Sequence, residues 1–66
     1  MTNQVKVQRA IHNLTQDDLA KEIGVSRQTI NSIEKNRYVP STILALKLSR
    51  KFNITVNEIF TLEGSD

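Results

Sequence analysis

The side chains best suited to chemistry in this sequence of 66 residues lie in one polar stretch, residues 24–36. A helix over 27–35 turns by about 100° per residue, which puts Ile30 and Ile33 on one edge and polar side chains on the opposite arc. The polar side chains on that arc are Arg27, Gln28, Asn31, Ser32 and Lys35. None of them is a carboxylate, and all can hydrogen-bond to base edges or to phosphates. An ordinary solvated helix has a similar face, so this pattern alone leaves both interpretations open.

Other groups that could do chemistry lack partners in the sequence. His12 is the only histidine and there is no cysteine, so neither a metal site nor a nucleophile–base pair can be assembled around it. Asp17 and Asp18 are adjacent, and they suit the positive N-terminus of a helix better than acid–base work. With two glycines in the chain, there is no glycine-rich phosphate loop. We therefore expect a protein that is not an enzyme and that has no metal and no cofactor.

The net charge of +2 is unevenly distributed along the chain. Lysines and arginines balance the acidic residues in 1–23, exceed them by five in 24–51, and are absent from 52–66, which carries a charge of −3. The positive charge therefore falls on the polar stretch and on the segment after it. A concentration of this kind is expected of a surface that binds a polyanion.

Length and composition set further bounds. A chain of 66 residues predicts one small domain, 1–66, and without cysteine its core must hold the fold unaided. The longest apolar run is far shorter than the roughly 20 residues of a membrane helix, and the N-terminus lacks the apolar stretch of a signal peptide. We expect a soluble cytoplasmic protein with no membrane partner.

Apolar spacing and capping residues predict five short helices. Val7, Ala10, Ile11 and Leu14 define the buried stripe of a first helix over about 4–13. Val5 lies off this stripe and is assigned either to an extended N-terminal arm or to a second contact. Thr15 caps a second helix that ends at Gly24, and Ser26 caps a third over about 27–35, with Asn36 as its left-handed stop.

The last two predicted helices follow the only proline, Pro40. Ser41 caps a helix over about 42–52, and the capping box from Thr55 to Glu58 opens a final turn that runs through Phe60. No strand is expected. The predicted fold class is all-α, a compact bundle of five short helices in which the second and third form a helix-turn-helix.

Several short motifs together resemble one known family. They are Thr15-Gln16, Leu19-Ala20, Gly24-Val25-Ser26, Ile30 and Ile33-Glu34. In this order and spacing they resemble the phage repressor and Cro type of helix-turn-helix regulator, the XRE family. The resemblance continues through Pro40-Ser41 and the last helix, so it covers nearly the whole chain. It is nearest to the small stand-alone members that consist of little more than the DNA-binding domain.

The resemblance implies a double-stranded DNA partner and a role for each matching residue. The residues that match base-reading positions are Arg27, Gln28 and Ser32, with Asn31 as an addition. Those that match phosphate-contacting positions are Gln16, Thr29, Lys35 and Arg37. For Tyr38 two roles stay open, namely packing at the edge of the core and a contact to phosphate. Arg9 and Glu34 match a structural ion pair between the first and third helices.

Two positions depart from the pattern of the family. Gln8 stands where members usually have a core leucine, which puts the packing of the first helix in doubt. Arg37 stands where they usually have glycine, and it adds a charge where the chain should pass near phosphate.

More apolar residues follow Pro40 than one small core should need. The residues in question are Ile43, Leu46, Ile54, Val56, Phe60 and Leu62. Some of them could simply close the core over the last helix, but the surplus indicates a homodimer interface. The predicted function is a sequence-specific transcription regulator, a repressor that binds a palindromic operator as a dimer with 27–35 in the major groove. The alternative is a protein-interaction module of the same fold, of the antitoxin or co-activator type, with a regulatory protein as partner.

Overall fold

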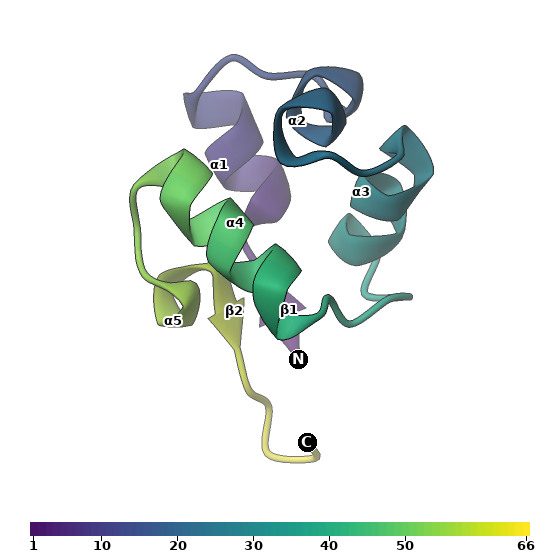
Figure 1. Cartoon of the computed structure of the whole chain (residues 1–66). Coiled ribbons are helices and arrows are strands. Elements are labelled where there is room, and N and C mark those ends of the chain that lie inside the picture. Colours follow the sequence, from purple (N-terminus) through teal and green to yellow (C-terminus); the bar gives the residue numbers. More distant parts are fainter.

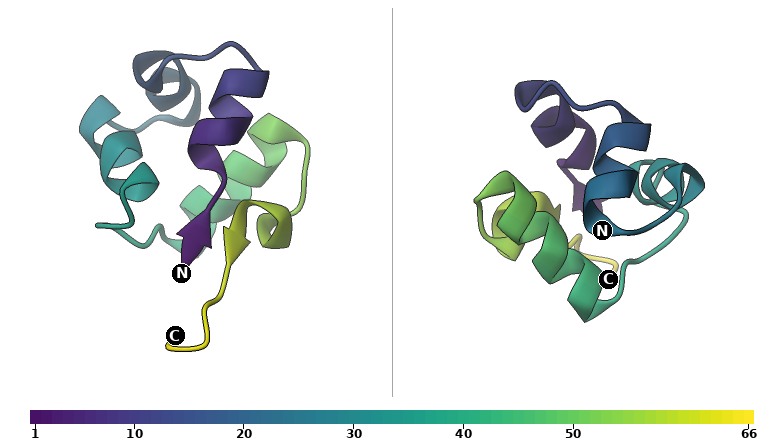
Figure 2. Two further views of the ribbon diagram at one scale, coloured as in Figure 1. Left: turned by 180° about the vertical axis from the view of Figure 1, so that it is seen from behind. Right: turned by 45° about the horizontal axis from the view of Figure 1, so that its top comes forward.

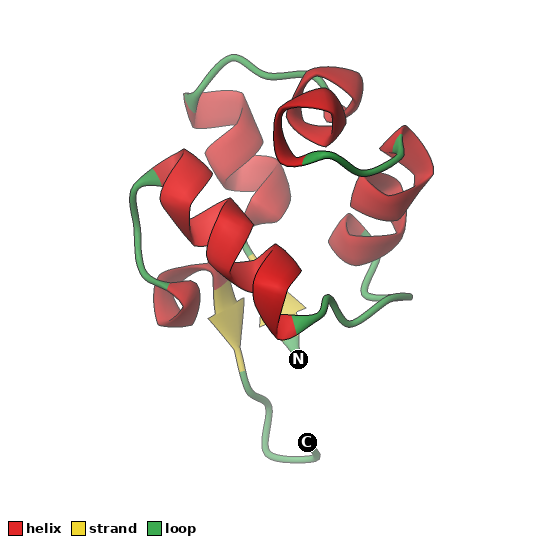
Figure 3. Ribbon diagram, in the orientation of Figure 1, coloured by secondary structure: helices red, strands yellow, loops and turns green.

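Five helices and one pair of short strands make up the chain, and the computed structural model describes all of it, residues 1–66. The helices are α1 (Val5–Ile11), α2 (Gln16–Ile23), α3 (Arg27–Glu34), α4 (Thr42–Phe52) and α5 (Val56–Ile59). The strands are β1 (Thr2–Asn3) and β2 (Phe60–Thr61), which pair with each other (Figure 1, Figure 3). The predicted bundle of five helices is confirmed. None of these helices combines the length and the apolar character needed to cross a membrane.

The helix ends follow the predicted capping signals. Each of four N-cap hydroxyls accepts a hydrogen bond from the backbone N–H three residues later; the caps are Thr15, Ser26, Ser41 and Thr55. Gly24 ends α2 with φ 77°, and Asn36 follows α3 with φ 59°, both in the left-handed region. At the start of α2, the hydrogen bond from the Thr15 backbone N–H lowers the pKa of the Asp18 carboxyl. Local sequence therefore sets where α2 and α3 begin and end.

The core is entirely apolar and takes residues from all five helices, most of them from α2, α3 and α4. In Figure 1, α4 runs across the front, α1 lies behind it, and α2 and α3 lie at the top and the right. The ten buried residues are Val5, Leu19, Ala20, Ile23, Ile30, Ile33, Leu44, Leu48, Phe52 and Ile59. Burying one large aliphatic or aromatic side chain contributes about 1.5–3 kcal/mol, so these contacts hold α3 against the rest of the molecule.

The stripe predicted for the first helix faces mostly outward, which is a correction. Val7 is 50% exposed and Ile11 is 63% exposed, whereas Val5 is fully buried and Gln8 is half-buried. The reason is Arg9, which lies four residues after Val5 on the same side of the helix. Its side chain reaches inward to Glu34 on α3. The rotation of α1 that satisfies Arg9 also buries Val5. Of the predicted stripe, only Leu14, beyond the end of α1, packs against the core.

The prediction of no strand, and of a last helix through Phe60, was also wrong. α5 ends at Ile59, and Phe60 is extended with φ −117° and ψ 133°. Phe60 lies opposite Asn3, and Thr61 lies opposite Thr2, in an antiparallel pair. The view from behind shows β1 and β2 side by side next to the start of α1 (Figure 2). Strands of two residues are too short to leave an alternating pattern in a sequence.

Candidate DNA-binding surface

The outer face of α3 is open to solvent along its length. Ile30 and Ile33 hold its inner edge in the core with 0% and 1% exposure. Gln28 and Lys35 on the opposite arc are exposed, as is Arg27, while Asn31 and Ser32 are half-buried. In Figure 1 α3 lies at one side of the molecule with α2 as its nearest helix, so its far side is uncovered. The polar arc predicted from the sequence is thus displayed on a helix that is rigidly packed on its other side.

A polar hollow of about 310 Å³ lies between α3 and the loop that follows it. Its lining residues are Ser26, Gln28, Thr29, Ser32, Arg37 and Tyr38. The hollow brings two predicted base-reading residues together with three predicted phosphate-contacting ones. Sequence reasoning assigned no binding role to Ser26, whose hydroxyl lies 2.9 Å from that of Thr29. Tyr38 lines this hollow, is 45% exposed and is not among the core residues.

A second hollow, of about 490 Å³, lies at the start of α2 and has no apolar lining residue. Its residues are Arg9, Thr15, Gln16, Asp17 and Arg27. The structure therefore separates the predicted contacts into two groups. Arg27 shares a hollow with Gln16 at the N-terminus of α2, whereas Gln28 shares the other one with Arg37. Lys35 lines neither hollow and stands at the C-terminal end of α3.

Arg9 and Glu34 form a two-pronged ion pair between α1 and α3. Arg9 Nε donates to Glu34 Oε2 at 2.8 Å, and Arg9 Nη2 donates to Glu34 Oε1 at 3.2 Å. The remaining terminal nitrogen, Nη1, donates to the carbonyl of Leu14 at 3.0 Å. The side chains are only 16% and 7% exposed, and the hydrogen bonds that Arg9 donates to Glu34 raise the pKa of Arg9 above its usual value. The predicted pair is present, and it fixes the far end of α3 to α1.

Asn3 is a positioning residue that sequence reasoning missed. Its Nδ2 donates to the carbonyl of Ile33 at 2.9 Å and to Oδ1 of Asn36 at 2.9 Å, while its Oδ1 accepts from the N–H of Val5 at 3.1 Å. The carbonyl of Ile33 also accepts from the backbone N–H of Asn36 at 3.0 Å, so Asn3 adds a second hydrogen bond at the C-terminal end of α3. No signal in the sequence links Asn3 to a helix end thirty residues away.

The cations of the candidate surface have no partners within the chain. Arg27, Lys35 and Arg37 take part in none of the ion pairs, which instead involve Arg9, Lys21, Lys51 and the N-terminal ammonium. Glu34, the only carboxylate in 24–51, is occupied by Arg9. The surface around α3 is therefore positive and uncompensated, which suits a polyanion.

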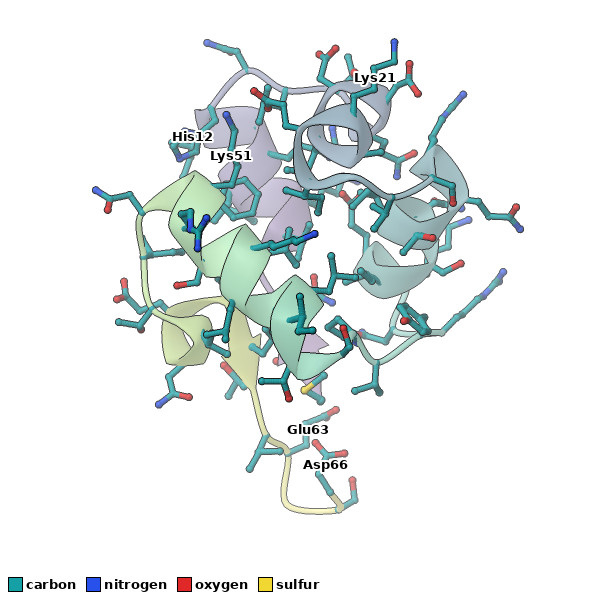
Figure 4. The ribbon with its side chains drawn as sticks, viewed as in Figure 1. His12, Lys21, Lys51, Glu63 and Asp66 are labelled. Carbon is teal, nitrogen blue, oxygen red and sulfur yellow. The ribbon has the colours of Figure 1, made fainter.

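The acidic residues near the C-terminus lie away from α3. Glu63 and Asp66 are on the tail below the helices, where they contact the N-terminal ammonium at 2.9 and 2.6 Å (Figure 4). Hydrogen bonds to these two carboxylates raise the pKa of the ammonium. His12 also lies elsewhere, on the far side of α1, with its ring 5.4 Å from that of Phe52. Neither group takes part in the candidate surface.

Of the six predicted dimer residues, two pack against the core, three are largely exposed, and Val56 lines an apolar groove. Ile54 and Phe60 pack against the core, so closing the core accounts for them. Ile43, Leu46 and Leu62 are 69%, 56% and 78% exposed. A mainly apolar groove of about 340 Å³ lies beside them, lined by Met1, Val39, Pro40, Thr42, Ala45, Leu46, Val56 and Phe60. Val39, 70% exposed, is an apolar residue of this region that the prediction left out.

The order of the helices and their spacing match a known family. The model of the helix-turn-helix family matches residues 5–59, from the start of α1 to the end of α5. The chain belongs to this family. The resemblance to XRE-type regulators is thereby confirmed.

Three known proteins show how far the similarity extends. An HTH-type transcriptional regulator of Methanocaldococcus jannaschii is 52% identical over 66 residues, which is 100% of both chains. The restriction-modification controller protein C.AhdI of Aeromonas hydrophila has a TM-score of 0.78 and 26% identity over 86% of each chain. A chain of the SinR protein/SinI protein complex has a TM-score of 0.80 and 26% identity, covering 98% of this chain and 70% of that one. The protein is therefore a DNA-binding transcription regulator, and its family is one of regulators, not enzymes.

Proposed function

We propose that the protein is a repressor that binds a palindromic operator as a homodimer, with α3 of each copy in the major groove. The observation that carries this proposal is the outer face of α3, which is polar, free of exposed carboxylates and flanked by three cations without ion-pair partners. A helix about 10–12 Å across fits a groove roughly 12 Å wide only when the face that enters avoids negative charge. Glu34 meets this condition because it is 7% exposed and bound to Arg9.

The two hollows suggest how the contacts are shared. Gln28 and Ser32 read base edges. Arg27, which shares a hollow with Gln16, and Asn31, whose Oδ1 accepts from Gln16 Nε2 at 3.3 Å, lie beside them on the flank of α3 that faces α2. The residues proposed to hold phosphates are Gln16, Thr29, Lys35, Arg37 and Tyr38. Contacts to phosphate set the register on the duplex, and contacts to base edges carry the sequence preference.

Dimerisation follows from the size of the surface. One small domain reading one half-site buries little area, whereas a two-fold dimer reads two half-sites about 34 Å apart on one face of the duplex. The exposed apolar residues Ile43, Leu46 and Leu62, with Val56 in the adjoining groove, are the proposed interface. A dimer seated on the operator would exclude polymerase, which is how repression would arise, and it would act in the cytoplasm where the DNA is.

A regulatory protein partner is the alternative, and one similar structure favours it. The matching chain of the SinR protein/SinI protein complex, of which this chain covers 70%, was solved together with another protein. In this alternative the apolar surface near Leu46 would bind the partner protein instead of a second copy.

Selection of bound duplexes from a random pool tests the proposal. At about 100 mM salt, where weak phosphate contacts alone no longer retain DNA, we expect enrichment of an inverted repeat. The distance between its halves gives the dimer geometry. Recovery of no enriched motif would contradict DNA reading by α3, and recovery of a single half-site would contradict the dimer.

The base-reading and phosphate-contacting roles can be separated with Gln28→Ala and Arg37→Ala. Gln28→Ala should lower discrimination by about tenfold at one base step, because an amide that pairs with a base edge is lost. Arg37→Ala should weaken binding to all sequences and reduce the salt slope by about one, because one phosphate contact is lost. Binding titrations with matched and mismatched duplexes at several salt concentrations measure both effects. A uniform loss for Gln28→Ala would show that Gln28 is not a base reader.

The proposed interface can be tested with Leu46→Glu. A carboxylate at the centre of an apolar contact must be desolvated without a partner, so the dimer dissociation constant should rise at least about tenfold. Sedimentation equilibrium measures this constant directly. Lys6→Glu is the control. It reverses the charge of an exposed side chain on α1, a larger change in charge than Leu46→Glu makes, and should leave self-association unchanged. A dimer of unchanged strength in Leu46→Glu would contradict this interface.

A further inference from the structure

Three of the six lysines and arginines in 24–51 lie outside the candidate DNA-binding surface. Lys47, Arg50 and Lys51 are on the second half of α4, and they line a third hollow, of about 610 Å³, between α4 and the C-terminal end of α2. Lys21 of α2 lines this α2–α4 hollow as well. Figure 4 shows Lys21 and Lys51 in the upper half of the molecule, on two helices that contact each other. Four cations from two helices therefore converge on one hollow.

The α2–α4 hollow has one carboxylate, which leaves most of its positive charge uncompensated. Glu22 Oε1 accepts from Lys51 Nζ at 2.8 Å, and the two side chains are 42% and 31% exposed. Lys47 and Arg50 are exposed and take part in none of the ion pairs. Lys21 has one carboxylate contact, at 3.4 Å, which water screens. With four cations and one carboxylate, the lining has an excess of three positive charges.

Stabilisation of helix ends explains only part of this cluster. Lys21, Arg50 and Lys51 stand in the last turns of their helices, where a cation interacts favourably with the helix dipole. Lys47 stands earlier in α4, outside its last turn. The dipole also gives no reason for cations of two helices to face one hollow, since like charges that gather destabilise the folded chain. An anion bound in the hollow would compensate them.

The surroundings of the α2–α4 hollow favour a small anion over a nucleic acid duplex. On α2, the exposed carboxylates of Asp17 and Asp18 come one turn before the residues that line the hollow. On α4, Ile43 and Leu46 come one turn before its cations and are 69% and 56% exposed. A broad duplex would bring phosphates against these carboxylates, because its charge continues along its length. A hollow of about 610 Å³ is instead within the range of roughly 300–1,000 Å³ found for small-molecule sites.

We propose that the α2–α4 hollow binds a small molecule with two or more linked phosphate groups. A terminal phosphate carries a charge of about −1.5 to −2 at pH 7, so a short chain of phosphates matches the excess charge of the lining. Arg50 offers a planar fork for a bidentate contact, and Lys21 and Lys47 offer point charges. The carboxylate of Glu22 faces the same space and lowers the affinity. This site shares no lining residue with the two hollows beside α3, so it is separate from the surface proposed to bind DNA.

Titration of the whole chain with inorganic tripolyphosphate, followed through its backbone amide signals in NMR spectra, tests the site without DNA. At about 100 mM salt we expect saturable binding that shifts the amide signals of Gly24 and Lys51, which line the hollow. Citrate, whose charges are on carboxylates, should bind at least about tenfold more weakly. The double variant Lys47→Gln, Arg50→Gln should weaken tripolyphosphate binding at least about tenfold, because two charge-assisted contacts are lost.

Glu22→Gln tests the site with an effect of the opposite sign. It removes the one carboxylate of the hollow and frees Lys51 from its ion pair, so tripolyphosphate should bind about twofold to fivefold more tightly. An unchanged or lower affinity would contradict binding in this hollow. A variant that merely loosened the fold would lower the affinity, so a gain cannot arise from partial unfolding.

Arg37→Ala is the matched control, since it removes one cation from the candidate DNA-binding surface and should leave tripolyphosphate binding unchanged. Loss of binding in this control but not in the double variant would place the anion beside α3 and overturn the inference. The absence of saturable binding, or equal binding of citrate, would overturn it too. A duplex without the operator motif is the last arm. If the double variant weakens its binding more than Arg37→Ala does, the hollow holds a second duplex, and the small-molecule inference is wrong.

Discussion

Replacing Glu34 by alanine should lower the free energy of unfolding by about 3 kcal/mol. The side chain is 7% exposed, and its loss leaves the guanidinium of Arg9, 16% exposed, without a counter-charge. Gln16 Nε2 also loses an acceptor at 3.2 Å. Small domains have a total stability of about 0.05–0.15 kcal/mol per residue, so this change would remove a large part of it. Urea unfolding followed by circular dichroism measures the difference.

Lys21→Ala is the matched control for this prediction. The ion pair of Lys21 with Asp17 has a nitrogen–oxygen distance of 3.4 Å, and the two side chains are 78% and 57% exposed. Water screens such a pair, and its removal should cost less than about 0.5 kcal/mol. Replacing both Arg9 and Glu34 by apolar residues of similar size should recover much of the loss, because no buried charge is then left alone. Equal costs for Glu34→Ala and Lys21→Ala would contradict a stabilising role for the buried pair.

Val5→Ala should cost about 2.5 kcal/mol of stability, while Val7→Ala should cost less than about 0.5 kcal/mol. The two valines are two residues apart on α1, but Val5 is 0% exposed and Val7 is 50% exposed. Truncating Val5 opens a cavity in the core, whereas truncating Val7 only removes surface that already touches water. The same unfolding measurement compares them directly. The reverse order of costs would mean that the stripe predicted from the sequence is the buried one after all.

The helix ends could be predicted because their signals are local. A hydroxyl at Ser26 or Ser41 and a left-handed residue such as Gly24 act on the backbone within three or four residues. The buried face of α1 could not be predicted in this way. α1 has only seven residues, and its rotation is set by Glu34, which is 25 residues from Arg9 in sequence. The apolar residues of α1 do recur with the period of a helix, but the stripe that they form faces solvent.

The pairing of β1 with β2 could not be predicted from the sequence for the same reason. Thr2 and Thr61 are at opposite ends of the sequence, and each strand is two residues long. The contribution of Asn3 depends on this pairing, because only a strand in that place brings its amide to the end of α3.

The part of the candidate site that lies on α3 alone could be predicted, because it follows from the period of one helix. The outer arc of α3 follows from its sequence, and with it the exposure of Gln28 and Lys35. How the arc is shared between the two hollows depends on the start of α2 and on the loop after α3. The hydrogen bond from Gln16 to Asn31 joins helices whose relative placement no local pattern describes.

β1 and β2 tie both ends of the chain to the C-terminal end of the helix proposed to enter the groove. Their pairing closes a loop of nearly the whole chain. A two-residue ladder, the backbone hydrogen bond from Gln4 to Ile59 and the ion pairs of the N-terminal ammonium offset the entropy of that closure. Contacts of this kind are among the first to open in local unfolding. When β1 detaches, Asn3 leaves the carbonyl of Ile33 and the side chain of Asn36, and the last turn of α3 keeps only its backbone hydrogen bonds and the pair of Glu34 with Arg9. Amide hydrogens near Lys35 would then exchange with solvent on the timescale of strand opening, although the core behind them stays closed.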